Sequence, residues 1–337
     1  MYRIKKTVLF TIVLGVLAAP ALAGVVKKSR TQVAFKGFGV LTMEQGERIA
    51  SDRKASETKT EFKGKGIMGK TLGSALLRSG SFGEIIDLPA MTVTSLDNKK
   101  KEYQTRPIEK IAMGEATGGS EPEPDAEARP SESDIKIIRS EFKVEATGET
   151  ETLNGFPSEK YAVLWQAEWE NVKTGARGTE KMTTLVWTTP MSDDLQAEEM
   201  TFSRAYLKAV GLDQDVMERS VLGGQWIQAL ASMNPANPAP SPQGRQVAKE
   251  LAKIKGYPVL IDGKYFSIRP EGEAQVEEKK GGGMPSLGKL AMGALKKKPK
   301  PGEENEPTVS YVIETLELAA AAVDETAFLV PAGYKQK

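Results

Sequence analysis

The most recognisable chemical pattern in this chain is residues 64–71, Gly-Lys-Gly-Ile-Met-Gly-Lys-Thr. It matches the phosphate-binding loop pattern G-x-x-x-x-G-K-T, in which backbone amides surround phosphates and the threonine hydroxyl binds Mg²⁺. It also contains G-x-G-x-x-G. A phosphate loop should follow a buried, continuously apolar strand, whereas residues 57–63 are charged at nearly every second position. We therefore expect a flexible, glycine-rich insertion here and not a nucleotide site.

Catalysis is limited by composition, because the chain contains no histidine and no cysteine. The commonest general base, the imidazole metal ligand and the thiolate nucleophile are all missing. Acidic residues such as Glu141, Glu145, Glu168 and Glu170 alternate with apolar ones and so fall on predicted solvent faces. We expect no enzyme activity, no cofactor and no metal site. A hydrolase that uses carboxylates, serine or lysine stays the third alternative.

Aromatic residues point instead to binding, since aromatic walls are usual in ligand pockets. The competing interpretation is that these side chains are ordinary core. The residues that we predict to line a ligand cavity come from two strands and one helix, and they are Trp165, Trp169, Phe142, Val144, Tyr161, Phe202 and Tyr206.

Most of these predicted cavity residues lie in residues 134–190, which are predicted to form strands. Three runs alternate apolar and polar residues with period two and are divided by turn residues, which is typical of antiparallel strands with one solvated face. In the first run the even-numbered residues from Ile138 to Ala146 share one face. In the second run, Trp165 and Trp169 point to one face of the strand, and Gln166 and Glu168 point to the opposite face. Pro190 ends the third run.

The chain before this region also predicts strands. Residues 33–43 alternate like one strand whose glycines suggest a bend or bulge, and residues 51–63 resemble an exposed edge strand. Residues 84–88, 91–96 and 101–105 follow as consecutive strands.

Behind Pro190 the apolar spacing changes to that of helices. A first helix is capped by Ser192 or Asp193 and ends at Gly211, and a second begins near Asp213. A third helix has Ser241 as its cap and Pro242 at its first position, and Gly256 follows its end.

The last third of the chain predicts a hairpin at residues 259–268, with its turn at Asp262-Gly263. Residues 308–318 then alternate like a strand at their front half. The composition of residues 314–322 also fits a helix, and we favour the strand.

Three segments read as insertions in one domain, at about residues 64–83, 116–134 and 273–306. Residues 116–134 are acidic and proline-rich without large apolar side chains, so they cannot bury enough surface to order. The other two mix glycine, methionine and leucine with lysine. Ordinary loops are the simpler interpretation, and a mobile lid or a membrane-surface contact is the alternative.

Residues 1–23 predict export. Arg3, Lys5 and Lys6 precede an apolar stretch, and Ala21-Leu22-Ala23 resembles a cleavage site. The apolar stretch is shorter than the roughly 20 residues that span a bilayer. We expect a periplasmic or secreted protein of residues 24–337, without a transmembrane segment. The 46 basic and 45 acidic residues nearly cancel, so no nucleic-acid partner is expected.

Several short motifs together carry a family resemblance. They are the strand pair at residues 85–88 and 101–103, the run at residues 153–156 with residues 159–161, the segment Gly256-Tyr257-Pro258-Val259, and the ending at residues 328–335. In these the chain resembles exported families of unknown function in the LolA/LolB-like lipoprotein-carrier superfamily. The resemblance implies a curved, incompletely closed antiparallel β-barrel, with helices on its concave face and space for acyl chains. It implies no catalytic residues.

From pattern and resemblance together we predict a mainly β protein with some α structure (α+β), formed as one domain. The predicted function is non-catalytic binding of an apolar ligand, such as a lipid or acyl chain, between sheet and helices. The alternative is an envelope structural or interaction protein that binds a protein partner and whose interior is filled by its own side chains.

Overall fold

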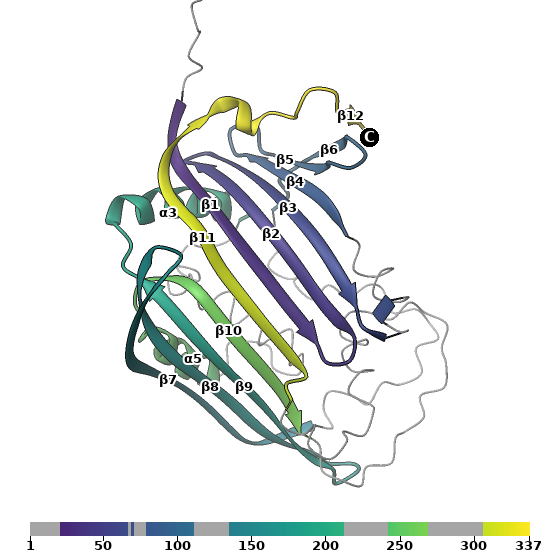
Figure 1. Cartoon of the computed structure of the whole chain (residues 1–337), viewed down its shortest axis with the longest axis vertical. Helices are drawn as coiled ribbons and strands as arrows, with labels where there is room; N and C mark the ends of the chain where they lie inside the picture. The colour runs from purple at the N-terminus through teal and green to yellow at the C-terminus, as the bar shows by residue number, and fades with distance from the viewer. Residues whose placement is uncertain (1–20, 67–68, 71–78, 111–134, 212–241, 269–305) are drawn as a thin grey trace, which may run out of the picture.

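The structure is a computed structural model that describes residues 21–66, 69–70, 79–110, 135–211, 242–268 and 306–337 (Figure 1). Within these ranges twelve strands form one sheet, in the order β12-β6-β5-β4-β3-β2-β1-β11-β10-β9-β8-β7. The strands are β1 (Ala21–Phe35), β2 (Gly39–Ala50), β3 (Arg53–Gly64), β4 (Gly80–Asp87), β5 (Thr92–Asp97), β6 (Glu102–Pro107), β7 (Ile135–Leu153), β8 (Phe156–Asn171), β9 (Arg177–Thr189), β10 (Tyr257–Ile268), β11 (Val309–Asp324) and β12 (Lys335–Gln336). All neighbours are antiparallel except the short β12–β6 pair. The sheet is not closed, so a mainly β, open antiparallel architecture is confirmed.

Two α-helices and one short 3-10 helix lie in the described ranges: α3 (Asp193–Ala209), α5 (Pro242–Leu251) and η5 (Glu325–Phe328). Ser192 caps α3 as predicted, because its hydroxyl accepts from the Leu195 amide at 3.3 Å. The prediction of α5 after Ser241 is also confirmed. The predicted helix from Asp213 and the segments 116–134 and 273–305 lie outside the described residues, as do residues 1–20 of the predicted signal.

Strands β7, β8 and β9 confirm the three alternating runs, with one correction at Ile138. The β7–β8 register shifts between Ile137 and Arg139, so Ile138 is an extra residue and is 48% exposed. A bulge of this kind reverses the side-chain alternation on one strand. Ile137, not Ile138, therefore lies opposite Trp169.

Two further strand predictions were wrong in their connections. Residues 33–43 are not one bent strand, because the chain reverses between Phe35 and Gly39 and β1 pairs with β2. Gly37 has a φ of 73°, which a turn at this place requires and other residues rarely adopt. Residues 53–64 form an interior strand between β2 and β4, not an exposed edge strand.

The predicted hairpin at Asp262-Gly263 is also wrong, because β10 runs straight through it. Gly263 pairs with Tyr311 of β11 on one side and with Thr184 of β9 on the other. The missing side chain has a packing reason, since a Cβ at this position would lie 2.1 Å from Cζ of Tyr311. A glycine inside a strand often marks such a close approach instead of a turn. The glycine makes room for an aromatic ring above the sheet.

We expect Gly263→Ala to destabilise the protein by about 1 to 3 kcal/mol, because the Tyr311 ring must move from its place. The measurement is denaturant unfolding of Gly263→Ala in the natural background and in a Tyr311→Ala background. The penalty should nearly vanish in the second background. An equal penalty in both would show that the ring is not the reason for the glycine.

Helices α3 and α5 pack on the same face of the sheet, which we call the helix-bearing face. Leu251 of α5 lies in a buried cluster with Ile261 of β10, and Phe202 of α3 lies in a second cluster with Val25 of β1. Ile261 pairs through β11 with Thr31 of β1. Thr31 and Val25 are both odd-numbered positions of one regular strand, so they point to the same side.

The opposite face is covered near β3 and β4 by the end of the chain. Phe328 of η5 and Val323 lie in a buried cluster with Ala55 and Ile85. The hydroxyl of Tyr334 donates to Oδ1 of Asn98 at 3.0 Å. Ile85 and Ile86 are consequently both buried, although they point to opposite faces.

Strand β7 is one end of the sheet, and α5 protects part of its edge. The Val144 amide donates to a carboxylate oxygen of Glu250 in α5 at 2.9 Å. This contact gives an edge N–H a partner inside the chain, which is one way in which proteins prevent pairing between copies.

Candidate functional site

Three mostly apolar rows of residues cross the helix-bearing face from β3 to β7. The register places the members of each row side by side on neighbouring strands. The first row is Phe62, Leu41, Val33, Tyr311, Gly263, Thr184, Val163 and Val144. The second is Thr60, Met43, Thr31, Ile313, Ile261, Val186, Tyr161 and Ala146. The third is Gly64, Gly39, Phe35, Val309, Tyr265, Met182, Trp165 and Phe142.

The rows are mostly buried on β8 and β9 and mostly half-buried at the other end. Near β7 to β9 they pack with Leu251 and Ile254, and Met182 and Val186 are at most 1% exposed. On β1, β2, β3 and β11 the members of the same rows keep partial exposure, except for the buried Gly39. We call this half-buried part the apolar strip, and it consists of Phe62, Leu41, Met43, Val33, Tyr311 and Ile313.

The seven predicted cavity residues are divided among three places. Phe142, Val144 and Tyr161 are buried in the cluster under α5, and Trp165 packs against it half-buried. Phe202 is buried in the separate cluster under α3, where its ring stacks on Tyr206 with centroids 6.2 Å apart. Six residues that the prediction joined therefore belong to two separate packed cores.

Trp169, the seventh predicted residue, belongs to a polar group at the far end of the same face. Its indole N–H donates to Glu180 at 3.3 Å, and the Ser267 hydroxyl donates to the same carboxylate at 2.9 Å. The Tyr265 hydroxyl donates to the second oxygen of Glu180. A half-buried carboxylate with three donors is well satisfied, so this group closes the apolar rows on that side.

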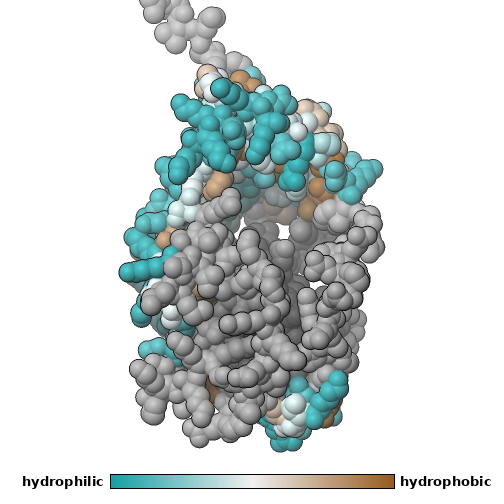
Figure 2. Space-filling view, turned by 90° about the vertical axis from the view of Figure 1, so that its right-hand side faces the viewer, coloured by the Kyte–Doolittle hydropathy of each residue, from teal (hydrophilic) through white to brown (hydrophobic). Residues whose placement is uncertain are grey.

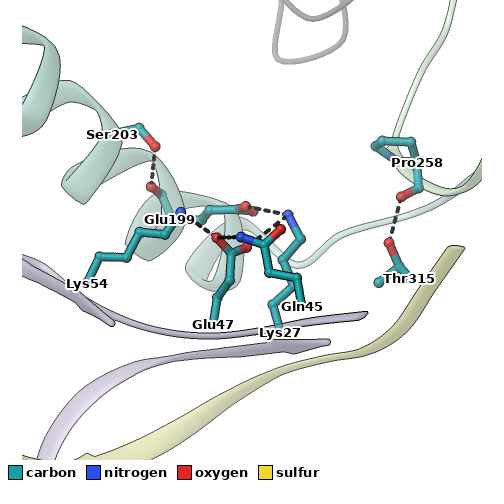
Figure 3. A network of polar contacts seen from close by, with 8 residues as sticks. All are labelled: Lys27, Gln45, Glu47, Lys54, Glu199, Ser203, Pro258 and Thr315. Carbon is teal, nitrogen blue, oxygen red and sulfur yellow. Dashed lines mark hydrogen bonds and ion pairs between the residues drawn. The ribbon is translucent and has the colours of Figure 1, made fainter. Parts of the chain in front are cut away.

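A second polar group lies on the other side of the rows, between the sheet and α3 (Figure 3). Nζ of Lys27 lies 3.4 Å from Oε1 of Glu199 in α3 and 3.8 Å from Oε2 of Glu47 in β2. Lys54 forms a further ion pair with Glu47. The Lys27 ammonium also lies 5.3 Å from the centre of the Tyr257 ring. Two cations and two carboxylates thus balance inside the fold.

The members of this polar group shift one another's pKa values. Burial by itself lowers the pKa of Lys27, but Tyr257, Glu199 and Glu47 outweigh that effect and raise the pKa above its ordinary value. Burial raises the pKa of the Tyr257 phenol, and Lys27 offsets part of that rise. Lys27 is therefore a cation and Tyr257 a neutral phenol at neutral pH.

Sequence reasoning did not select the residues of the apolar strip or the Lys27 group. Val33 and Tyr311 were recognised as alternating strand residues, but nothing local shows that β1 and β11 are neighbours. Lys27 lies just after the predicted signal segment of residues 1–23, next to Lys28. The usable signal was parity, since Val25, Lys27 and Val33 share one face of a single strand.

The phosphate-loop match has the wrong surroundings for a nucleotide site. Strand β3, which leads into it, is antiparallel to both of its neighbours and carries alternating polar residues. The Lys65 amide donates to the Phe38 carbonyl at 2.8 Å, which ties the start of the segment to the β1–β2 turn. Residues 67–68 and 71–78 lie outside the described residues.

The described ranges hold no group of three or more acidic residues placed to bind a metal ion. None of their helices has the length and apolar character needed to cross a bilayer.

Two features concern the outside of the molecule, a small pocket and the surface colouring. A small pocket of about 10 Å³ lies on the opposite face among Arg139, Glu141, Gln166 and Glu168, so it is not part of the predicted cavity. Figure 2 shows mostly hydrophilic residues on the coloured surface in the upper part of the molecule, with a smaller number of hydrophobic residues among them.

In comparisons with known proteins, no family model, curated protein or solved structure matches the chain.

Proposed function

We propose that this is an exported, non-catalytic protein that binds an apolar ligand, such as a lipid or acyl chain, between the helix-bearing face of the sheet and its helices. The observation that carries the proposal is the apolar strip. Six large apolar side chains from four adjacent strands keep partial exposure on the face that elsewhere forms the core.

Physical chemistry favours a ligand at such a surface. Each Å² of apolar surface removed from water contributes about 25 cal/mol, and contiguous apolar patches often mark ligand grooves. Neighbouring strands lie about 4.8 Å apart, so the strip extends about 14 Å from β3 to β11. An elongated chain-like ligand suits this shape.

The finer architecture in the proposal is a curved sheet with its helices on the concave side, as the resemblance to the LolA/LolB-like superfamily implies. That α3 and α5 share one face of an open sheet supports it. The strip then lies on the concave side between the two helix-covered cores.

The test is binding of the neutral fluorescent probe N-phenylnaphthylamine to a matched pair of variants. Leu41→Gln introduces an amide into the strip, and Val40→Gln makes the same kind of change on the opposite face, where Val40 is 38% exposed. We expect Leu41→Gln to weaken probe binding about tenfold or more, because the amide must lose its water. Val40→Gln should bind like the natural protein.

Native mass spectrometry of the protein purified from its own host gives an independent measurement. A bound lipid favours the proposal. Absence of any bound lipid, together with no probe binding, would contradict it and favour the structural or protein-interaction alternative.

A further inference from the structure

The Lys27 group lies beside the apolar strip on the same two central strands. Lys27 and Val33 point to one face of β1, and Glu47 and Leu41 to the same face of β2. Lys27 is four positions from Thr31 of the second row, which is about 13 Å along the strand. A cation therefore stands at one end of a half-buried apolar surface.

The two carboxylates beside Lys27 differ in how they are held. Glu47 is fixed on β2, where its carboxylate also pairs with Lys54 and accepts from Gln45 at 3.4 Å. Glu199 comes from α3, and its carboxylate accepts from Nζ of Lys27 at 3.4 Å (Figure 3). The Lys27 and Glu199 side chains are 21% and 20% exposed, so water and solutes reach this pair. The pair between Glu47 and Lys54 balances itself without Glu199.

We propose that Lys27 binds the anionic end group of an amphiphile whose apolar chain lies on the apolar strip, and that Glu199 occupies this position until the ligand displaces it. The inference rests on the proposed function. The ligand class is a single-chain amphiphile that ends in a carboxylate or a phosphate.

Charge balance makes the exchange reasonable. An ammonium that is mostly buried is costly without an anionic partner. A ligand carboxylate that takes the place of the Glu199 carboxylate leaves the local charge beside Lys27 unchanged. The displaced Glu199 side chain then turns from Lys27 toward solvent. A neutral end group has no means of displacing Glu199. The natural protein should thus bind the anionic amphiphile only modestly more tightly than the neutral one. The attraction between Lys27 and the ligand is offset by the loss of the ion pair between Lys27 and Glu199.

The experiment compares hexadecanoate, hexadecyl phosphate and hexadecanol as competitors of N-phenylnaphthylamine, each below its micelle concentration. Glu199→Gln should tighten hexadecanoate binding roughly tenfold, since the Glu199 carboxylate no longer competes with the ligand carboxylate for Lys27. Hexadecanol should be unaffected by this change. Hexadecyl phosphate distinguishes the two end groups, and the tighter of the two anions identifies the natural class.

Lys27→Met supplies the opposite change, and it should abolish the preference for anions over hexadecanol. Lys28→Met is the matched control, because Lys28 points to the other face and pairs with Glu317 at 2.5 Å. That variant should keep the preference. If Lys27→Met does not fold, Glu199→Gln decides alone.

The outcomes separate this inference from the proposed function. An unchanged ratio of hexadecanoate to hexadecanol affinity in Glu199→Gln overturns the role of Lys27 and Glu199, while probe displacement by hexadecanol leaves the apolar site in place. Failure of all three amphiphiles to displace the probe, or of the probe to bind, overturns both.

Discussion

Replacing Phe202 by alanine is expected to cost about 3 to 5 kcal/mol of the free energy of unfolding, as large-to-small changes in a packed core do. Phe202 is 4% exposed and lies among Val25, Ile49 and Ile86 in the cluster that joins α3 to the sheet. Its aromatic partner Tyr206 would lose a stacked neighbour. Denaturant unfolding measures the change.

Ser203→Ala is the control for this experiment, because Ser203 is the next residue of α3 and is exposed. Its hydroxyl donates only within the helix, to the Glu199 carbonyl at 3.1 Å. We expect a change within about 0.5 kcal/mol. A cost below about 1 kcal/mol for Phe202→Ala would return Phe202 to the predicted cavity wall, where part of its surface has no protein contact.

Lys27→Met is expected to cost about 3 kcal/mol, the low end of what breaking a buried ion pair costs. The change leaves the Glu199 carboxylate without its cation, while Glu47 keeps Lys54. The partial exposure of Lys27 reduces the penalty, since water reaches the abandoned charge. Unfolding free energies of Lys27→Met and of Lys27→Met/Glu199→Gln provide the measurement.

The double variant should recover about half of the loss, because it removes the uncompensated charge. Lys28→Met should change stability by less than about 1 kcal/mol, as exposed ion pairs do. Equal losses in the single and double variants would mean that Lys27 acts through its apolar stem and not through its charge.

Local patterns in the sequence predicted faces well and neighbours poorly. Period two correctly placed Trp165 with Tyr161 and Val163, because alternation is a property of one strand. It failed at Ile138, where one extra residue reverses the alternation and no nearby residue announces it. Asp262-Gly263 was predicted to be a turn, because the same dipeptide occurs in hairpin turns and at places within a strand where another group comes close to the backbone. Here the deciding group is the ring of Tyr311, far along the chain.

The candidate site was harder to predict than the strands, for the same reason. Its residues meet through the pairing of β1 with β11, whose residues lie at opposite ends of the chain. Nothing in the local sequence marks Lys27 or Glu47 as a pair, and α3 lies above them and adds Glu199. Contacts between distant segments determine which half-buried residues belong together.

The place of β11 in the sheet has a consequence for the order of folding. Strands β1 to β6 and strands β7 to β10 each pair mainly with their neighbours along the chain, but the two groups join only through β11. Because β11 begins at Val309, the join forms only after nearly all of the chain has been made. Until then β1 and β10 are edge strands with unpaired backbone groups, which attract other chains. Assembly through such distant pairing is intrinsically slow, so the time between synthesis and insertion of β11 is when this protein is most exposed to aggregation.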